Sequence, residues 1–387
     1  MATTDRYDVV VVGAGVFGAW TAWNLRRRGQ KVLLVDAYGP GNARSSSGGE
    51  SRIIRMGYGA DEIYTRWAQK SLALWKEFFG FKRPGLFYET GVLWLGAEGD
   101  ARVRGTAATL ARCGVTFEEL DGGELAKRYP QIGLDGIATG LLEPQSGVLM
   151  ARRAVAAVVE AAVVNGAEYR VLEIVTPERA QGSGGLTSIT TRGGERIEAE
   201  QFVFACGAWL GKLFPEVLGE RIFVSRQEVF FFGVPAGDMR FSPSALPTFL
   251  FQGDESYGMP DLESRGFKIA LDRHGVRVDP DTQSRVVSGD VAEDVRRYVA
   301  RRFPGLRDAP IVETRVCQYE NTSSGDFLID RHPEMENVWF VGGGSGHGFK
   351  HGPAVGEYVV GRILDGAEGE PRFSFSSKDT VQRRAVY

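Results

Sequence analysis

Three closely spaced glycines and an aspartate form the clearest chemical pattern in the sequence. Gly13, Gly15 and Gly18 have the G-x-G-x-x-G spacing, and Asp36 follows 18 residues after the last of them. The first glycine permits a tight turn, the second lets a pyrophosphate approach a helix N-terminus, and the third lets helix and strand pack closely. A terminal acid can accept hydrogen bonds from ribose hydroxyls. The pattern predicts a bound dinucleotide; the alternative is a glycine-rich turn that binds nothing.

The elements that must position this turn lie on either side of it. Residues 9–12 are four consecutive valines, which is typical of a strand buried on both faces of a parallel sheet. A helix is expected over residues 16–28, and a second buried strand over residues 31–36. Together these segments predict one βαβ unit around the glycine turn.

Composition limits the other possibilities. The 387 residues are 43% hydrophobic and 25% charged, which predicts a globular protein of two or three lobes. The 51 glycines indicate many tight turns and close backbone approaches. A net charge of −3 without a long basic run argues against nucleic acid, and no apolar stretch is long enough to span a bilayer. Three scattered cysteines indicate neither a disulfide framework nor a metal site, so we expect a cytoplasmic protein.

The rest of the chain divides into recognisable segments by periodicity and turn residues. A hairpin is expected over residues 87–95, turning around Thr90 and Gly91, and the second lobe is expected to contain an antiparallel sheet. Helices are predicted over residues 61–79, from a capping box at 121–124 to Pro130, over 151–164, and from about 350 to about 363. Buried strands are predicted at 202–205 and 338–341, and further strands at 222–232 and 267–271, with turns at 182–185 and 193–194.

Four further motifs give the sequence a resemblance to a known family. They are Arg52-Ile53-Ile54-Arg55, Gly207-Ala208-Trp209, Cys317-Gln318-Tyr319 and Ser345-Gly346-His347-Gly348-Phe349-Lys350. With the opening glycines, and in order from about residue 5 to 365, they resemble the monomeric sarcosine oxidase family and its N-methyltryptophan and pipecolate oxidase relatives. These belong to the D-amino-acid-oxidase-like FAD enzymes.

The resemblance implies a fold and a reaction. The fold is α/β, with a Rossmann-like FAD domain in three pieces (1–87, 151–218 and 322–387) and an antiparallel-sheet substrate domain (88–150 and 219–321). The reaction is oxidation of a secondary (N-alkyl) amino acid or related amine to an imine, with O2 reduced to H2O2, by a monomer. Three alternatives stay open: an amine dehydrogenase using another acceptor, a pipecolate or fructosyl-amino-acid oxidase, and a non-enzymatic FAD-holding module.

The resemblance also assigns roles to side chains that carry charge or a thiol. Cys317 would form a thioether to FAD, which needs electropositive surroundings, whereas Cys206 is expected to be a small buried residue. Arg55 and Lys350 would bind a substrate carboxylate, the alternative for each being a surface salt bridge. Lys268 would promote oxygen reduction, although an exposed strand lysine would show the same alternation of neighbours.

The remaining assignments concern the pocket and one departure from the family. Where the family has a histidine four residues after the oxygen-activating lysine, this chain has Asp272, and it has Ser47 and Gly48 where histidines are usual. An acid near the flavin would favour a cationic or larger amine and alter the pH profile. The expected catalytic residues are Lys268, Arg52, Asp272 and Tyr257, and the substrate-binding residues are Arg55, Lys350, Tyr319 and Gly346. The expected cofactor-binding residues are Gly13, Gly15, Gly18, Asp36, Ser51, Arg52, Val171, Gly207, Trp209, Cys317, Gly343, Gly344, Gly346, Gly348 and Lys350.

Overall fold

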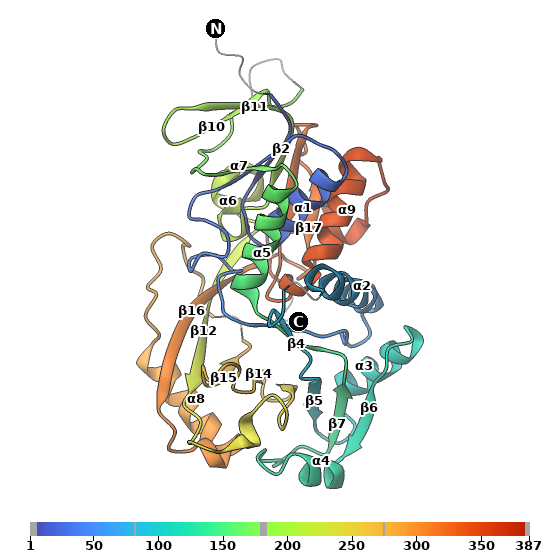
Figure 1. The fold of residues 1–387 in the computed structure, drawn as a ribbon, viewed down its shortest axis with the longest axis vertical. Coiled ribbons are helices and arrows are strands. Elements are labelled where there is room, and N and C mark those ends of the chain that lie inside the picture. Colours follow the sequence, from blue (N-terminus) through green and yellow to red (C-terminus); the bar gives the residue numbers. More distant parts are fainter. Residues whose placement is uncertain (1–5, 81–82, 179–183, 274, 384–387) are drawn as a thin grey trace.

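A mainly parallel sheet organises the upper of two lobes in the computed structural model, which describes residues 6–80, 83–178, 184–273 and 275–383 (Figure 1). The strand order is β17-β18-β11-β1-β2-β9, and β10 pairs with β11 beside this path. The β17–β18 and β10–β11 pairs are antiparallel, and the other pairs are parallel. The strands are β1 (Tyr7–Val12), β2 (Val32–Asp36), β9 (Glu168–Val171), β10 (Ser188–Thr190), β11 (Arg196–Phe204), β17 (Leu328–Arg331) and β18 (Val338–Gly342).

The valines of β1 explain why this sheet is buried on both faces. Val9 and Val11 belong to the apolar cluster formed with the helices on one face, while Val10 and Val12 belong to the cluster on the other face. This alternation follows from the two-residue period of a strand. The helices of the first face are α1 (Val16–Arg27), α2 (Glu62–Phe79), α5 (Ala151–Val164) and α9 (Gly352–Leu364), and those of the second are α6 (Leu210–Leu213) and α7 (Pro215–Leu218).

An eight-stranded sheet forms the other lobe, in the order β16-β12-β15-β14-β13-β5-β7-β6. Its neighbours are antiparallel except for the parallel β5–β13 pair. The long strands β12 and β16 pair along nearly their whole length and reach toward the upper lobe (Figure 1). The strands are β5 (Val92–Gly96), β6 (Glu118–Asp121), β7 (Thr139–Glu143), β12 (Phe223–Phe232), β13 (Thr248–Phe251), β14 (Ser256–Met259), β15 (Phe267–Leu271) and β16 (Ile311–Asn321); the helices are α3 (Ala101–Arg112), α4 (Gly122–Arg128) and α8 (Gly289–Arg302).

A small third sheet shows that the predicted hairpin at residues 87–95 is wrong. The sheet has the order β3-β8-β4, with β3 (Arg52–Ile54), β8 (Gly147–Leu149) and β4 (Phe87–Tyr88). β4 pairs with β8, whereas β5 pairs with β7 and β13 in the large sheet. Gly91, at φ +72°, donates its N–H to the carbonyl of Ser146. The segment therefore carries the chain from one sheet to another instead of folding it back.

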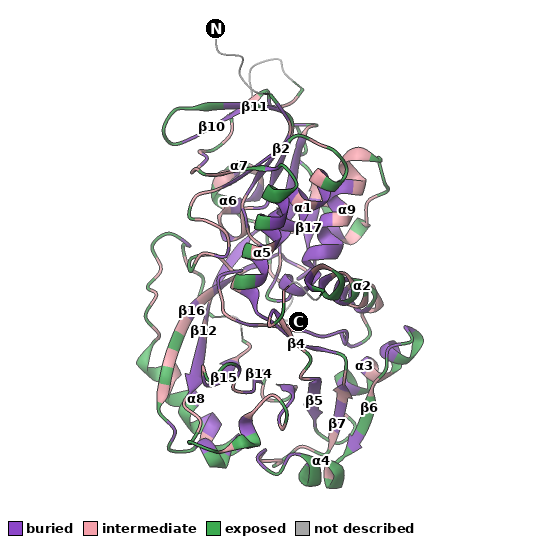
Figure 2. Cartoon of the chain, in the orientation of Figure 1, coloured by how far each residue is buried: buried purple, intermediate pink, exposed green. Residues whose placement is uncertain are grey.

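The structure confirms most other predicted elements and the two-lobed α/β architecture. The capping box forms around Asp121 and Glu124, and α5 has the predicted bounds. α9 begins two residues later than expected, because Phe349–His351 forms a separate 3₁₀ turn before it. Gly182 and Ser183 of one predicted turn lie outside the described residues. In the part of the chain that is described, no helix is both long and apolar enough to cross a membrane. Buried residues concentrate in the sheets and where the lobes meet (Figure 2).

Candidate active site

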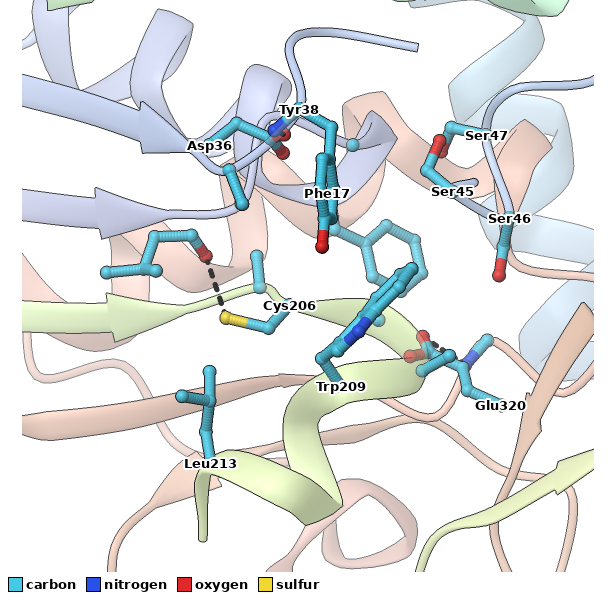
Figure 3. A pocket seen from close by; sticks show the side chains of 18 of the residues that line it. Phe17, Asp36, Tyr38, Ser45, Ser46, Ser47, Cys206, Trp209, Leu213 and Glu320 are labelled. Atoms are coloured by element: carbon cyan, nitrogen blue, oxygen red, sulfur yellow. Dashed lines mark hydrogen bonds between the residues drawn. The ribbon is translucent and has the colours of Figure 1, made fainter. Parts of the chain in front are cut away.

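A cavity of ≈ 400 Å³ opens where the carboxyl ends of β1, β2, β11 and β18 meet. The end of β16 and the loop before β3 complete its wall, so segments far apart in the sequence line it together. This edge of a parallel sheet is where ligands bind in open α/β folds. Residues labelled among its walls in Figure 3 are Phe17, Asp36, Tyr38, Ser45, Ser46, Ser47, Cys206, Trp209, Leu213 and Glu320.

The glycine turn brings the first strand and helix unusually close together. Gly13 has a φ of +105°, and a Cβ atom on it would lie 2.3 Å from the carbonyl oxygen of Ala205. A Cβ atom on Gly18 would lie 1.8 Å from the carbonyl oxygen of Gly13. Any side chain at either position would therefore displace backbone, as the sequence pattern predicts for the tight turn and the helix–strand contact.

Gly15 has a different environment, because it faces the cavity. It is the N-cap residue of α1 and offers no side chain to cap that helix. A Cβ atom on Gly15 would have Ser47 Oγ as its neighbour, at 3.4 Å, and that hydroxyl accepts the N–H of Val16 at 3.1 Å. The bare turn thus presents the positive end of the α1 dipole to the cavity, which is a site for an anionic group.

Asp36 ends β2 at one side of the cavity and fixes the turn. Its Oδ2 accepts the N–H of Ala14 at 2.8 Å, and its Oδ1 accepts those of Tyr38 and Gly39 at 2.8 and 2.9 Å. Burial raises the pKa of Asp36, and these three backbone hydrogen bonds oppose that shift. A carboxylate has about four acceptor positions, so Asp36 retains capacity to accept a ribose hydroxyl.

Arg52 lines the other side of the cavity, and beside it Cys317 lines a smaller neighbouring cavity together with Lys268. Arg52 Nη2 lies 3.3 Å from Cys317 Sγ and donates to the Ser46 carbonyl at 2.9 Å. Arg315, two residues before Cys317, instead forms ion pairs with Glu313 and Glu50. Arg52 is therefore the positively charged neighbour that a thioether at Cys317 would need.

Lys268 lies beside this pair and is not an exposed strand lysine. It is only 2% exposed, and its Nζ donates to the carbonyl and hydroxyl oxygens of Ser51 at 2.8 and 3.2 Å. Burial, reinforced by the charge of Arg52, lowers the pKa of Lys268 well below its usual value. Ser51 therefore takes part in the site by holding Lys268.

Arg55 and Lys350 come together on one tyrosine, although they are far apart in the sequence. The guanidinium carbon of Arg55 lies 4.4 Å from the ring centroid of Tyr58 and 4.8 Å from that of Trp94. Lys350 Nζ donates to the Tyr58 hydroxyl at 2.8 Å and to the His347 carbonyl at 2.9 Å. Both cations are 4% exposed, so neither is a surface salt-bridge residue. Burial, and then the charge of Arg55, hold the pKa of Lys350 well below its usual value.

Tyr319, Asp272 and Tyr257 form a group next to these cations. Tyr319 donates its hydroxyl to Asp272 Oδ1 at 3.1 Å. Burial raises the pKa of Asp272 to about 6, while Tyr319, Arg55 and Lys350 oppose that shift. Burial and the charge of Asp272 raise the pKa of Tyr257 to about 12 and that of Tyr319 well above its usual value. Asp272 is therefore ionised at neutral pH, and both phenols stay protonated.

The glycine-rich segment after β18 lies against Tyr319. A Cβ atom on Gly346, at φ +78°, would lie 2.7 Å from the Tyr319 ring, so that ring covers the backbone at this point. Of the other residues predicted to bind the cofactor, those lining the cavity are Gly207, Trp209, Gly344, Gly346 and Gly348.

Of the residues predicted to bind the cofactor, those that do not line this cavity are Gly18, Ser51, Val171, Cys317, Gly343 and Lys350. Gly343, at φ +68°, turns the chain against Thr322. The side chain of Val171 is exposed at the end of β9, and the wall is formed by the residues after it, from Leu172 to Thr176. The offset at Val171 arises because β9 ends there and the chain then crosses the cavity mouth.

The sequence patterns did not identify two buried carboxylates, those of Glu143 and Glu320. Glu143 accepts the N–H groups of Met56 and Gly57 at 2.6 and 3.0 Å and the indole N–H of Trp94 at 2.7 Å, which fixes the segment after Arg55. Glu320 lies in the cavity wall next to Tyr319. A glutamate in a strand carries no local pattern, and the burial of Glu320 is visible only in the folded chain.

Comparisons with known proteins extend over nearly the whole chain. A family model described as FAD dependent oxidoreductase matches residues 8–362. Monomeric sarcosine oxidase of Bacillus sp. (strain B-0618) is 33% identical over 94% of this chain and 93% of its own length. N-methyl-L-tryptophan oxidase of Salmonella arizonae is 29% identical over 93% of this chain and 95% of its own length. The crystal structure of L-proline dehydrogenase from P. horikoshii is similar with a TM-score of 0.82 and 22% identity, covering 96% of this chain and 97% of that one.

Proposed function

Since the chain belongs to the FAD dependent oxidoreductase family, we propose that it oxidises a secondary (N-alkyl) amino acid or a related amine to an imine and reduces O2 to H2O2. The substrate loses two electrons and two protons, which are those that O2 needs to become H2O2, and water then hydrolyses the imine. The observation that carries the proposal is the buried pair Arg55 and Lys350, joined through Tyr58 next to the cofactor cavity.

The residues of the cavity fit FAD. A bare helix N-terminus at Gly15 suits a pyrophosphate, Asp36 suits a ribose, and Gly207, Gly344 and Gly348 leave the middle of the wall free of side chains. FAD supplies the two-electron acceptor that no protein side chain provides.

Arg55 and Lys350 would bind the substrate carboxylate. Arginine offers a planar fork for two carboxylate oxygens, and a lysine adds a concentrated charge. Two cations withdrawn from water cost free energy, and an anion bound between them offsets that cost. A neutral amine without a carboxylate would leave both charges uncompensated, which selects for an amino acid.

Asp272 would interact with the amine end of the substrate. Because Asp272 is ionised above about pH 6, it attracts a cationic group and stabilises the protonated form of the amine. Tyr319 holds one oxygen of Asp272, and the backbone of Gly346, whose carbonyl would be an acceptor for the amine, packs against the Tyr319 ring. This arrangement orients the amine and favours substrates that carry an additional positive charge.

Lys268 would act on O2, and Cys317 would act on FAD. Lys268, held by Ser51, provides a positive group where O2 gains negative charge during reduction. Cys317, beside Arg52, would form a thioether that anchors FAD. We further propose that the chain is a cytoplasmic monomer, in line with the relatives named monomeric sarcosine oxidase.

The test is a screen of the purified protein with N-alkyl amino acids, their primary analogues and their decarboxylated amines. We expect loss of the visible flavin absorbance on anaerobic addition of an N-alkyl amino acid, and one H2O2 for each amine oxidised in air. Loss of absorbance without H2O2 would instead indicate a dehydrogenase that uses another acceptor. No loss of absorbance with any secondary amine would refute the proposed reaction.

A further inference from the structure

Glu320 is a buried acid in the wall of the FAD cavity. It lies on β16, where it is paired with Val224 of β12, and the residue is 7% exposed. Figure 3 shows its carboxyl group among the side chains that line the cavity. Nothing in the proposed amine oxidation uses this carboxyl group.

The hydrogen bonding of Glu320 is incomplete. Oε1 accepts the N–H of Gly344 at 3.2 Å, whereas Oε2 is buried and has no hydrogen-bond partner within the described residues. Its surroundings include glycines: a Cβ atom on Gly207 would lie 3.3 Å from Oε2, and one on Gly342 would lie 3.6 Å from Oε1. These glycines have no side chains that could pair with the carboxyl group, so Oε2 is left without a hydrogen-bond partner in a residue that lines the cavity.

The charge state of Glu320 follows from this environment. Burial raises its pKa to about 7, and the N–H groups of Gly344 and Gly343 oppose the shift. The other titratable residues that line the cavity are Asp36, Tyr38, Arg52, Glu173, Arg192, Cys206, Lys212, Asp281 and Tyr319. Arg52 donates to Cys317 and the Ser46 carbonyl, and Lys212 pairs with Asp279 and Asp281.

Two other acidic groups near Glu320, those of Asp36 and Cys206, also do not stabilise its ionised form. Asp36 carries its own backbone hydrogen bonds, and burial together with Asp36 and Glu320 raises the pKa of Cys206 well above its usual value. With a pKa of about 7, the carboxyl group of Glu320 changes between its neutral and ionised forms near neutral pH. A neutral carboxyl group is a hydrogen-bond donor as well as an acceptor.

We propose that the protonated carboxyl group of Glu320 donates a hydrogen bond to an oxygen of bound FAD, and that FAD is retained more tightly when Glu320 is neutral. The pyrophosphate and ribityl portions of FAD are rich in oxygen acceptors. An ionised Glu320 has no proton to donate and repels the negative pyrophosphate. The proposal rests on FAD binding alone and is independent of which amine is oxidised.

The sign of the pH dependence follows from linkage. FAD binds the protonated form better, so binding raises the pKa of Glu320 further above its ordinary value. Affinity is then fully present below about pH 7 and is lost as pH rises, by at most tenfold per pH unit. The affinity for FAD continues to fall with rising pH until the pH exceeds the pKa of Glu320 in the FAD complex.

The test measures FAD dissociation from the holoprotein in a Cys317→Ser background, in which no thioether holds the flavin. Release is followed by the recovery of flavin fluorescence on dilution at several values between pH 6 and pH 9. We expect the Kd of the Cys317→Ser protein to rise more than tenfold across this range. Adding Glu320→Gln should give tight binding with a flat profile, because the amide is a neutral donor at every pH.

Two further variants separate this interpretation from a structural role. Glu320→Leu, which has no donor, should bind FAD at least tenfold more weakly than Glu320→Gln at pH 6. Glu313→Gln, on the same strand but paired with Arg265 and Arg315, should keep the pH dependence of the parent. The rise in unfolding temperature on adding FAD to the Cys317→Ser protein, larger at pH 6 than at pH 9, gives a second measurement without altering Glu320.

Three outcomes would overturn the proposal. They are a pH dependence that persists in Glu320→Gln, equal binding by Glu320→Gln and Glu320→Leu at pH 6, and a flat profile in the parent protein. None of them involves amine turnover, so failure here leaves the proposed reaction standing, and failure of that reaction leaves this test intact.

Discussion

Replacing Lys350 by methionine tests whether the buried cation pair recognises a carboxylate. Methionine has a similar length and no charge, so the substitution removes the ammonium group while leaving an apolar stem of comparable volume. In the wild type, Lys350 uses two of its three donors on the Tyr58 hydroxyl and the His347 carbonyl. The third donor is available for a substrate oxygen.

The expected loss can be estimated from that single contact. A hydrogen bond to a charged group contributes about 1.5–3 kcal/mol, which corresponds to roughly 10- to 150-fold in affinity. The pH dependence has a definite sign. Burial lowers the pKa of Lys350, so its charge, and the contribution of that charge to carboxylate binding, is present at low pH and is lost as pH rises. Lys350→Met should remove this part of the pH dependence.

The assay compares two ligands, an N-alkyl amino acid and the amine that remains when its carboxyl group is removed. Binding is read from the change in the flavin spectrum at several pH values under anaerobic conditions. Lys378→Met is the matched control: Lys378 is 1% exposed, its pKa is lowered to about 8 by burial, and its Nζ donates to the Arg372 carbonyl. Lys350→Met should weaken binding of the amino acid by about 10- to 150-fold and binding of the amine hardly at all. Lys378→Met should leave the ratio of the two affinities unchanged. Equal losses for both ligands in Lys350→Met would refute carboxylate recognition.

Three other substitutions test separate parts of the site. Gly15→Val should abolish FAD binding, because the valine methyl groups would enter the cavity at the α1 N-terminus; a variant that purifies with a full flavin spectrum contradicts this. Cys317→Ser should release its flavin on acid precipitation, unlike the wild type and unlike Cys206→Ser; acid-extractable flavin in the wild type would exclude the thioether. Asp272→Asn should move the acidic limb of the kcat profile, which reports groups in the enzyme–substrate complex, to lower pH, since an anion that stabilises the protonated form of the bound amine is lost. It should also reduce any preference for substrates with a second positive charge, and an unchanged profile and preference would place Asp272 outside amine recognition.

Local sequence patterns predicted those parts of the fold in which neighbours along the chain determine the structure. The βαβ unit was predictable because the valines of β1, the glycine turn and Asp36 form one continuous pattern within residues 9–36. The predicted hairpin at 87–95 failed because a turn signal at Gly91 does not specify a partner strand. The partners of β4 and β5 lie more than forty residues away, in β8 and β7. Strand pairing at that separation depends on packing that no short segment encodes.

The site was predictable where the resemblance supplied motifs and unpredictable where burial decides the chemistry. The alternation around Lys268 fits an exposed lysine and a buried one equally well, and only its 2% exposure separates them. Glu143 and Tyr58 position the segment after Arg55 and the Lys350 side chain through contacts that join distant segments. Neither residue stands in a pattern that would mark it, since a single glutamate or tyrosine in a strand or loop is common.

The positive charges of Arg55 and Lys350 are balanced only when an anion is bound beside them. Arg55 and Lys350 are buried together, and Asp272 and Glu143 are the acids that raise the pKa of Lys350. Glu143 is committed to Met56, Gly57 and Trp94, and Asp272 accepts from Tyr319. The lowered pKa of Lys350 shows that these acids do not fully offset its burial beside Arg55. A carboxylate placed between the two cations supplies the missing counter-charge, so the same electrostatics that destabilise the free site favour an anionic substrate.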